Sequence, residues 1–396
     1  MIAAGILILV LAVGPYLGGR AYARRVESMN EPVEDRLHRL DRVQRAGGFG
    51  LPIVAVIALY ALGVVDRVTA PVGTAGPDLF GFAVLEFAVI MLVVFGIVAL
   101  PIVSMALGTY PVVRSLRGTS ASTWRVIKGV VAVMAISLVS VAIAVLGFFA
   151  ITSVVGSSTP VLVAGLGVIV FATFGLSPYL IVLFQDRVPL SGEHRERVER
   201  VCTELGYRPR GLYVLEGEST RTANAIVAGT LPGFRYVFLT DYLLDECDDD
   251  ELRAVVAHEF GHVAGRHLWQ RGLLTVAVFG GWVFGAEYVG FGPLVERLDF
   301  LGIFLPLMGL YVLYHVGLLG GLARWQEFRA DAYAAREAGR EAMIGALETL
   351  ADANDVRREA GLLYSLATHH PPITDRIEAV RAGRGEDDWS RATTRE

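Results

Sequence analysis

Cysteine and lysine are both scarce in this chain of 396 residues. The two cysteines, Cys202 and Cys247, lie far apart and form no CxxC pair, and in a reducing cytosol we expect no structural disulfide between them. The single lysine, Lys128, lies outside the last apolar stretch, which excludes a retinal-binding receptor with a lysine in its last membrane span. The net charge is −5 and no concentrated basic tract occurs, which argues against nucleic acid as a partner.

Long apolar stretches, in contrast, are abundant, since 54% of the residues are hydrophobic and the mean hydropathy is +0.51. A helix that crosses a membrane needs about 20 mostly apolar residues, because every backbone polar group there must be hydrogen-bonded internally. Seven stretches meet this requirement, at residues 2–18, 50–65, 82–107, 127–151, 159–184, 272–292 and 299–323. They are nearly uncharged and lack the polar face of a helix in a soluble protein. We therefore expect a mainly α-helical integral membrane protein with about seven transmembrane helices.

Arginine is concentrated in alternate loops between these stretches. The loops after the first, third and fifth stretches contain Arg20, Arg24, Arg25, Arg36, Arg39, Arg42, Arg45, Arg114, Arg117, Arg125, Arg187, Arg195, Arg197 and Arg200. The loops after the second and fourth stretches are nearly free of basic residues. Basic residues near the ends of membrane spans are retained on the cytoplasmic side. We therefore expect the N-terminus outside and the polar segments and C-terminus in the cytosol. We also expect the membrane to be that of a prokaryotic cell.

The apolar stretches divide the chain into four segments: a five-span region at 1–184, a polar segment at 185–271, two spans at 272–323 and a polar C-terminal segment at 324–396. In the first polar segment, SGEHRERVERVCTELG has helical spacing, and GLYVLE, ANAIVAG and RYVFLT are typical of short strands. The acidic run DECDDDEL precedes a second helical pattern, ELRAVVAHEFGHVAGRHLW, and we interpret it as a helix cap because carboxylates favour a helix N-terminus. Both polar segments flank the last two spans, so we expect them to meet at the membrane surface as one small α+β domain.

The second helical pattern contains His258, Glu259 and His262 in the sequence HEFGH. Residues four apart on a helix are separated by about 40° in azimuth and roughly 6 Å along the axis, so the two imidazoles can bind one metal ion. Zn²⁺ prefers imidazole and carboxylate ligands in tetrahedral geometry, and a catalytic site keeps one position for water. Glu259 can take a proton from that water as it attacks a carbonyl. We expect one zinc ion per chain at this site.

A catalytic zinc ion also needs a third protein ligand. The pattern HExxHxxGxxH would supply a histidine, but its last position is Leu268. His267 comes one residue early, and on a continuous helix it points away from His258, so we interpret it as a capping, interface or structural residue. Glu327 is the better candidate, because it follows the seventh apolar stretch and Asp331 shares its helix face. Asp331 can then hydrogen-bond a ligand histidine or assist proton transfer.

Four motifs along the chain resemble, in the same order, those of the membrane gluzincins. This family of zinc metalloendopeptidases includes the type I CAAX prenyl proteases and the bacterial heat-shock membrane protease. The motifs are NAxxxG with Asn224, Ala225 and Gly229, HEFGH, EFRAD with Glu327 and Asp331, and HPPxxxRI with His370 and Arg376. The resemblance covers roughly residues 195–380.

Specific roles are implied by this resemblance. It implies a zincin-like catalytic domain, split around the last two spans, in which zinc is bound by His258, His262 and Glu327. Glu259 would be the catalytic base, and Asp331 would be a proton donor or support a ligand. Asn224 and Ala225 would hold an extended peptide along a strand edge, and His370 and Arg376 would contact the substrate or the developing oxyanion.

Two classes of function follow from these patterns. The first is an integral membrane zinc metalloendopeptidase that hydrolyses membrane-associated, lipidated or misfolded proteins at the cytosolic face. Its partners would be a peptide or protein substrate and the lipid bilayer. The second is a non-enzymatic seven-span receptor or transporter in which the metal motif is incidental or structural. Broken helices at the midplane of paired repeats would indicate a transporter, and none is evident in the sequence, so the motifs favour the peptidase.

Overall fold

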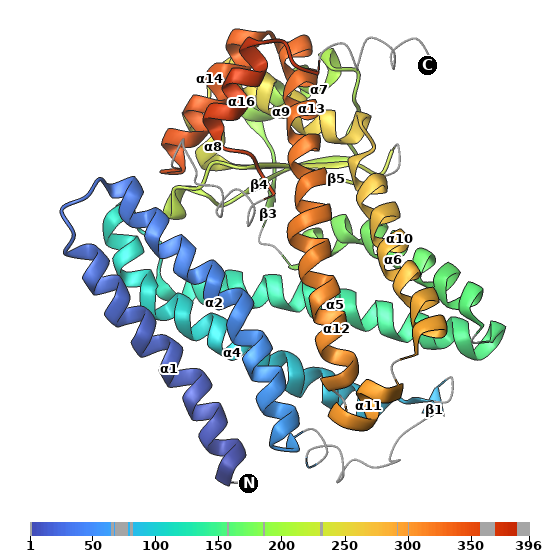
Figure 1. The fold of residues 1–396 in the computed structure, drawn as a ribbon. Coiled ribbons are helices and arrows are strands. Elements are labelled where there is room, and N and C mark those ends of the chain that lie inside the picture. Colours follow the sequence, from blue (N-terminus) through green and yellow to red (C-terminus); the bar gives the residue numbers. More distant parts are fainter. Residues whose placement is uncertain are drawn as a thin grey trace. The chain divides into compact units, whose positions relative to one another are not determined.

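Helices predominate in the computed structural model of this chain (Figure 1). The structure describes residues 2–64, 67, 78–79, 82–156, 158–184, 187–229, 233–290, 292–299, 301–356 and 369–385. They divide into two compact units, Met1–Val154 and Val155–Glu396. The mainly α-helical class that the sequence predicts is confirmed.

The described residues of the first unit include four long helices. Its elements are α1 (Ile2–Glu27), α2 (Val33–Ala61), the short antiparallel strands β1 (Asp78–Leu79) and β2 (Phe82–Ala83), α4 (Val84–Arg117) and α5 (Thr123–Val155). Helix α4 packs against both α1 and α2. Gly108 on α4 permits this close approach, because a Cβ atom at that position would overlap the carbonyl oxygen of Tyr16 on α1.

The second unit contains a small sheet and the remaining helices. Its first half comprises α6 (Thr159–Phe184), β3 (Arg187–Pro189), α7 (Gly192–Glu204), β4 (Gly211–Leu215), the 3₁₀ turn η1 (Glu218–Thr220), β5 (Ala225–Ala228), β6 (Tyr236–Thr240), α8 (Asp241–Glu246) and α9 (Asp249–Ala264). Its second half comprises α10 (His267–Val289), α11 (Gly292–Leu298), α12 (Leu301–Val312), the π-helical segment η2 (Leu313–Leu319), α13 (Gly320–Ala338), α14 (Arg340–Ala353) and α16 (Ile373–Arg381).

The sheet has the strand order β3-β4-β6-β5. Strands β4 and β6 are parallel, whereas β3 and β5 pair antiparallel with their neighbours. Successive side chains of β6 alternate between two apolar clusters: Val237 and Leu239 join the main core, and Tyr236 and Phe238 join a smaller one. Strand β5 lies at one edge of the sheet, so half of its backbone groups face away from β6.

Helices α7, α9, α13 and α14 form the main core together with the sheet (Figure 1). Helix α9 begins with a capping box, in which Asp248 accepts a hydrogen bond from the backbone of Glu251 and Glu251 accepts one from the backbone of Asp248. The interpretation of the acidic run as a helix cap is therefore confirmed.

Helix α9 packs closely along α13. Gly261, inside HEFGH, makes this contact possible, because a Cβ atom there would lie only 3.0 Å from the Cα atom of Ala330. The two polar segments of the sequence thus meet through the pairing of these helices.

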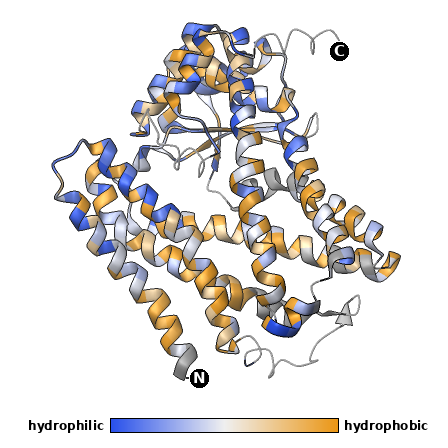
Figure 2. Ribbon diagram, in the orientation of Figure 1, coloured by the Kyte–Doolittle hydropathy of each residue, from blue (hydrophilic) through white to orange (hydrophobic). Residues whose placement is uncertain are grey.

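Five helical segments are long and apolar enough to cross a membrane, counted among the described residues (Figure 2). They are Gly5–Glu27, Val33–Ala61, Leu92–Arg117, Thr123–Ala144 and Leu301–Ala338. A sixth span results if His267–Tyr288 and Gly292–Leu298, which meet at a bend of 89°, are counted together. The predicted stretch at 159–184 corresponds to α6, of which Thr159–Thr173 qualifies as a shorter apolar helix. The chain is an integral membrane protein, while the number of seven spans stays a prediction.

Candidate metal centre

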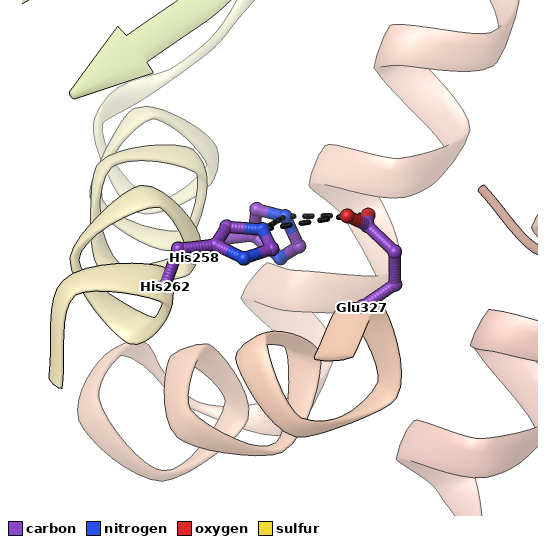
Figure 3. Close-up of side chains that lie close together, drawn as sticks. All are labelled: His258, His262 and Glu327. Atoms are coloured by element: carbon purple, nitrogen blue, oxygen red, sulfur yellow. Dashed lines mark hydrogen bonds and ion pairs between the residues drawn. The ribbon is translucent and has the colours of Figure 1, made fainter. Parts of the chain in front are cut away.

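Two helices bring three side chains with metal-binding atoms to one point (Figure 3). Helix α9 supplies His258 and His262, and α13 supplies Glu327. The Nε2 atoms of the two imidazoles are 3.2 Å apart. The carboxylate oxygens of Glu327 lie 3.6 Å from Nε2 of His258 and 3.4 Å from Nε2 of His262. The three side chains that the sequence predicts as ligands therefore converge.

These separations fit a zinc ion. Ligand atoms at the corners of a tetrahedron, each about 2.0–2.1 Å from zinc, are about 3.4 Å apart. Two imidazoles and one carboxylate are also a donor set that zinc prefers. Burial, together with the neighbouring His258, lowers the pKa of His262 to about 2, so this imidazole is neutral, as a metal ligand must be.

His258 is oriented by a buried ion pair. Its Nδ1 atom lies 2.8 Å from Oδ1 of Asp331, on the same side of α13 as Glu327. Arg376 on α16 donates two hydrogen bonds to this carboxylate, at 2.6 and 2.8 Å. Asp331 is 1% exposed and Arg376 8% exposed, so the pair is screened from solvent. Arg376 thus contacts Asp331, the aspartate behind the candidate ligand His258. It is not among the residues that line the pocket beside the candidate metal ligands, which is described below.

His262 has a different partner, His267, whose predicted orientation differs from the one in the structure. Helix α9 ends at Ala264, and α10 begins at His267 after Arg266, whose φ of 52° and ψ of 36° break the helix. The break turns the His267 ring back, so that its Nδ1 atom lies 2.8 Å from Nδ1 of His262. The expectation that His267 points away assumed a continuous helix, and it is wrong for that reason.

Glu259 lies between the metal ligands and the edge strand. One of its carboxylate oxygens accepts a hydrogen bond from the backbone N–H of Val227 on β5, at 3.4 Å. Burial raises the pKa of Glu259 above that of an ordinary carboxyl group. The carboxylate is therefore held beside the ligands by the strand that forms the edge of the sheet.

The edge of β5 is partly occupied by another side chain. The side chain of Asn354, just after α14, accepts a hydrogen bond from the backbone N–H of Ala223 at 3.0 Å. It also donates a hydrogen bond to the backbone carbonyl oxygen of Ala223 at 2.9 Å. Because alternate residues of a strand direct their backbone groups to the same side, Ala225 and Val227 face this edge as Ala223 does. Asn224 instead bonds to Thr240 of β6 through its backbone, and its side chain is exposed. No sequence pattern pointed to Asn354.

A pocket of about 480 Å³ joins these features. Strand β5 lines it together with Glu259 and the three candidate ligands, and α10 contributes Trp269. His370 lies at its mouth with a side chain that is 70% exposed and with Nδ1 2.9 Å from Oε2 of Glu327. The predicted residues Asn224 and Ala225 also line the pocket.

A helical HExxH with a glutamate from a second helix, beside an edge strand, defines a metallopeptidase-like centre. Residues 190–384 match the family model of Peptidase family M48. The CAAX prenyl protease 1 homolog of Arabidopsis thaliana is 31% identical over 229 residues, which are 53% of this chain and 52% of that protein. Protease HtpX of Pseudomonas paraeruginosa is 33% identical over 184 residues, which are 40% of this chain and 62% of that protein. The chain thus spans roughly half to three fifths of the length of these relatives.

A solved structure shares the fold as well. Ste24p of S. mikatae aligns with a TM-score of 0.66 over 95% of this chain and 98% of that chain, at 15% sequence identity. Residues 190–384 thus match peptidase family M48, a family of zinc metallopeptidases. The resemblance predicted from the motifs is confirmed.

Proposed function

We propose that this protein is an integral membrane zinc metalloendopeptidase that hydrolyses peptide bonds of membrane-associated, lipidated or misfolded proteins at the cytosolic face. The observation that carries the proposal is the convergence of His258, His262 and Glu327, at 3.2–3.6 Å, with Glu259 beside them in a pocket bordered by β5. The match of residues 190–384 to a peptidase family supports it.

The roles of the site residues follow from their positions. His258, His262 and Glu327 would hold one zinc ion per chain, which when bound acidifies a water molecule and polarises the substrate carbonyl. Glu259 would accept the proton of the attacking water and pass it to the leaving amine. Asp331 would fix the orientation of His258, to which it lies at 2.8 Å. For Arg376, its buried pairing with Asp331 favours a positioning role over the contact with substrate expected from the resemblance.

Substrate would add to the sheet as a further strand along β5. Ala225 supplies a backbone N–H and C=O on the outer side, whereas Ala223 is already paired with Asn354. The exposed side chain of Asn224 would contact the same peptide. His370 lies at the pocket mouth, where its imidazole could donate to an oxyanion that forms at the scissile carbonyl.

The arrangement in the membrane is part of the proposal. The segments 185–271 and 324–396 would form the catalytic domain in the cytosol, with the N-terminus outside, as the distribution of arginine predicts. The name of one relative, a CAAX prenyl protease, suggests a prenylated peptide as one substrate class, and a misfolded membrane protein is the other class in the proposal. Cleavage assays with one substrate of each class distinguish them.

The decisive test compares the parent with Glu259→Gln. We expect equal zinc content, one ion per chain, and hydrolysis of an unstructured protein substrate lowered by at least about 100-fold in the variant, because the proton acceptor is lost. Glu199→Gln, a change of an exposed glutamate on α7, is the matched control and should leave hydrolysis unchanged. Equal hydrolysis by Glu259→Gln and the parent would refute the mechanism.

A further inference from the structure

The break between α9 and α10 places a second buried imidazole directly against a candidate ligand. The Nδ1 atoms of His262 and His267 are 2.8 Å apart, with the rings edge to face. His267 is 2% exposed. Gly265 makes room for its ring, because a Cβ atom at that position would overlap Nε2 of His267. The glycine in the turn between α9 and α10 therefore leaves the space that the His267 imidazole occupies.

The chemistry of two facing imidazole nitrogens fixes which one carries the proton. His262 directs Nε2 to Glu327 and His258, so in the metal-bound form that nitrogen is the ligand and the proton is on Nδ1. A partner at 2.8 Å from a donating Nδ1 has to accept. His267 therefore accepts through Nδ1 and carries its own proton on Nε2.

We propose that His267 is a positioning residue that accepts a hydrogen bond from His262 and so fixes the ring and the tautomer in which His262 binds zinc. This inference rests on the proposed zinc site. It gives the two imidazole ligands different supports, since His258 donates to Asp331 and His262 donates to a neutral histidine.

A buried glutamine connects the start of α10, which carries His267, to the helix that carries the third candidate ligand, Glu327. Gln326, which is 0% exposed and precedes Glu327 on α13, donates to the backbone carbonyl of His267 at 3.1 Å. It also donates to the side chain of Gln270 at 2.9 Å and accepts from Nε of Arg271 at 2.7 Å. Both polar atoms of the Gln326 amide thus have partners within the first five residues of α10. The turn that positions His262 is fixed to the helix that supplies Glu327.

The test uses two substitutions of equal shape. His267→Asn places an amide group close to the position of Nδ1, whereas His267→Leu has the same size and no acceptor. Zinc dissociation constants of the purified full-length protein are measured by competition with a chelator. We expect His267→Leu to bind zinc about 10- to 100-fold more weakly than the parent, and His267→Asn to recover most of that loss.

Controls separate this inference from the proposed function and from misfolding. Thermal unfolding of the metal-free proteins shows whether each variant is folded, and His267→Phe replaces the leucine variant if leucine prevents folding. His38→Phe alters a buried histidine of the first unit and should leave zinc affinity unchanged. Equal zinc affinity in the parent and in the leucine or phenylalanine variant would overturn the role of His267 alone. A parent that binds no zinc would overturn the proposed function.

Discussion

Replacement of Arg376 by methionine tests the buried support of the metal centre. Methionine has a similar length but no charge, so Asp331, at 1% exposure, would keep a carboxylate whose two hydrogen bonds from Arg376 are gone. Breaking one partner of a buried ion pair costs about 3–5 kcal/mol, because the remaining charge stays out of water. In a unit of about this size each kcal/mol lowers the unfolding temperature by about 2–4 °C, so we expect a decrease of roughly 6–20 °C.

The Arg376→Met substitution should also weaken zinc binding through the candidate ligand His258. Asp331 accepts from His258, and loss of such support typically weakens metal binding about 10- to 100-fold. Thermal unfolding followed by tryptophan fluorescence and zinc competition assays measure the two effects. Arg195→Met is the matched control, because Arg195 makes an exposed pair with Glu199 that is worth about 0.3–0.5 kcal/mol. If Arg376→Met unfolds and binds zinc like the parent, the reasoning about the buried pair is wrong.

Two further predictions concern packing and thiol chemistry. Gly261→Ala should cost about 1–3 kcal/mol and reduce zinc content, because the new methyl group meets Ala330 of α13, whereas Gly321→Ala, with nothing within 4 Å, should be neutral or stabilising by up to about 1 kcal/mol. Zinc analysis and thermal unfolding check both, and normal zinc content and stability in Gly261→Ala would contradict the packing argument. Cys202 and Cys247 are free and buried, and burial raises the pKa of each to about 12, so neither should react with an alkylating reagent at pH 8 until the protein is denatured, when both should. Mass spectrometry counts the labels, and rapid labelling of the folded protein would contradict the burial of these thiols.

Local periodicity was sufficient to predict the parts of the site that lie on regular helices. The four-residue spacing of His258 and His262 places both rings on one side of α9, and the same argument pairs Glu327 with Asp331 on α13. Such spacing cannot reveal where a helix ends. The sequence around Gly265 predicts that α9 continues through His267, whereas the structure has a break before His267, so the predicted orientation of the His267 ring is wrong.

Contacts between segments that are distant in the chain could also not be predicted from the sequence. Asn354 pairs with the backbone of Ala223, which lies 131 positions earlier, and an asparagine after a helix is ordinarily a turn residue. The pairing of Arg376 with Asp331 likewise depends on how α16 packs against α13. Composition predicted that the chain lies in a membrane, but the bend of 89° after α10 is a tertiary feature that hydropathy does not encode.

The helix that carries Glu327 is continuous from Leu301 to Ala338, through the π-helical segment η2. At about 1.5 Å per residue its 38 residues measure roughly 57 Å, whereas the hydrocarbon layer is about 30 Å thick. Glu327 lies about 39 Å along this helix from Leu301, so if Leu301 lies at one boundary of the hydrocarbon layer, Glu327 lies beyond the other boundary at a tilt of about 20°. One continuous helix therefore joins an apolar segment long enough to cross a membrane to a ligand of the candidate metal centre.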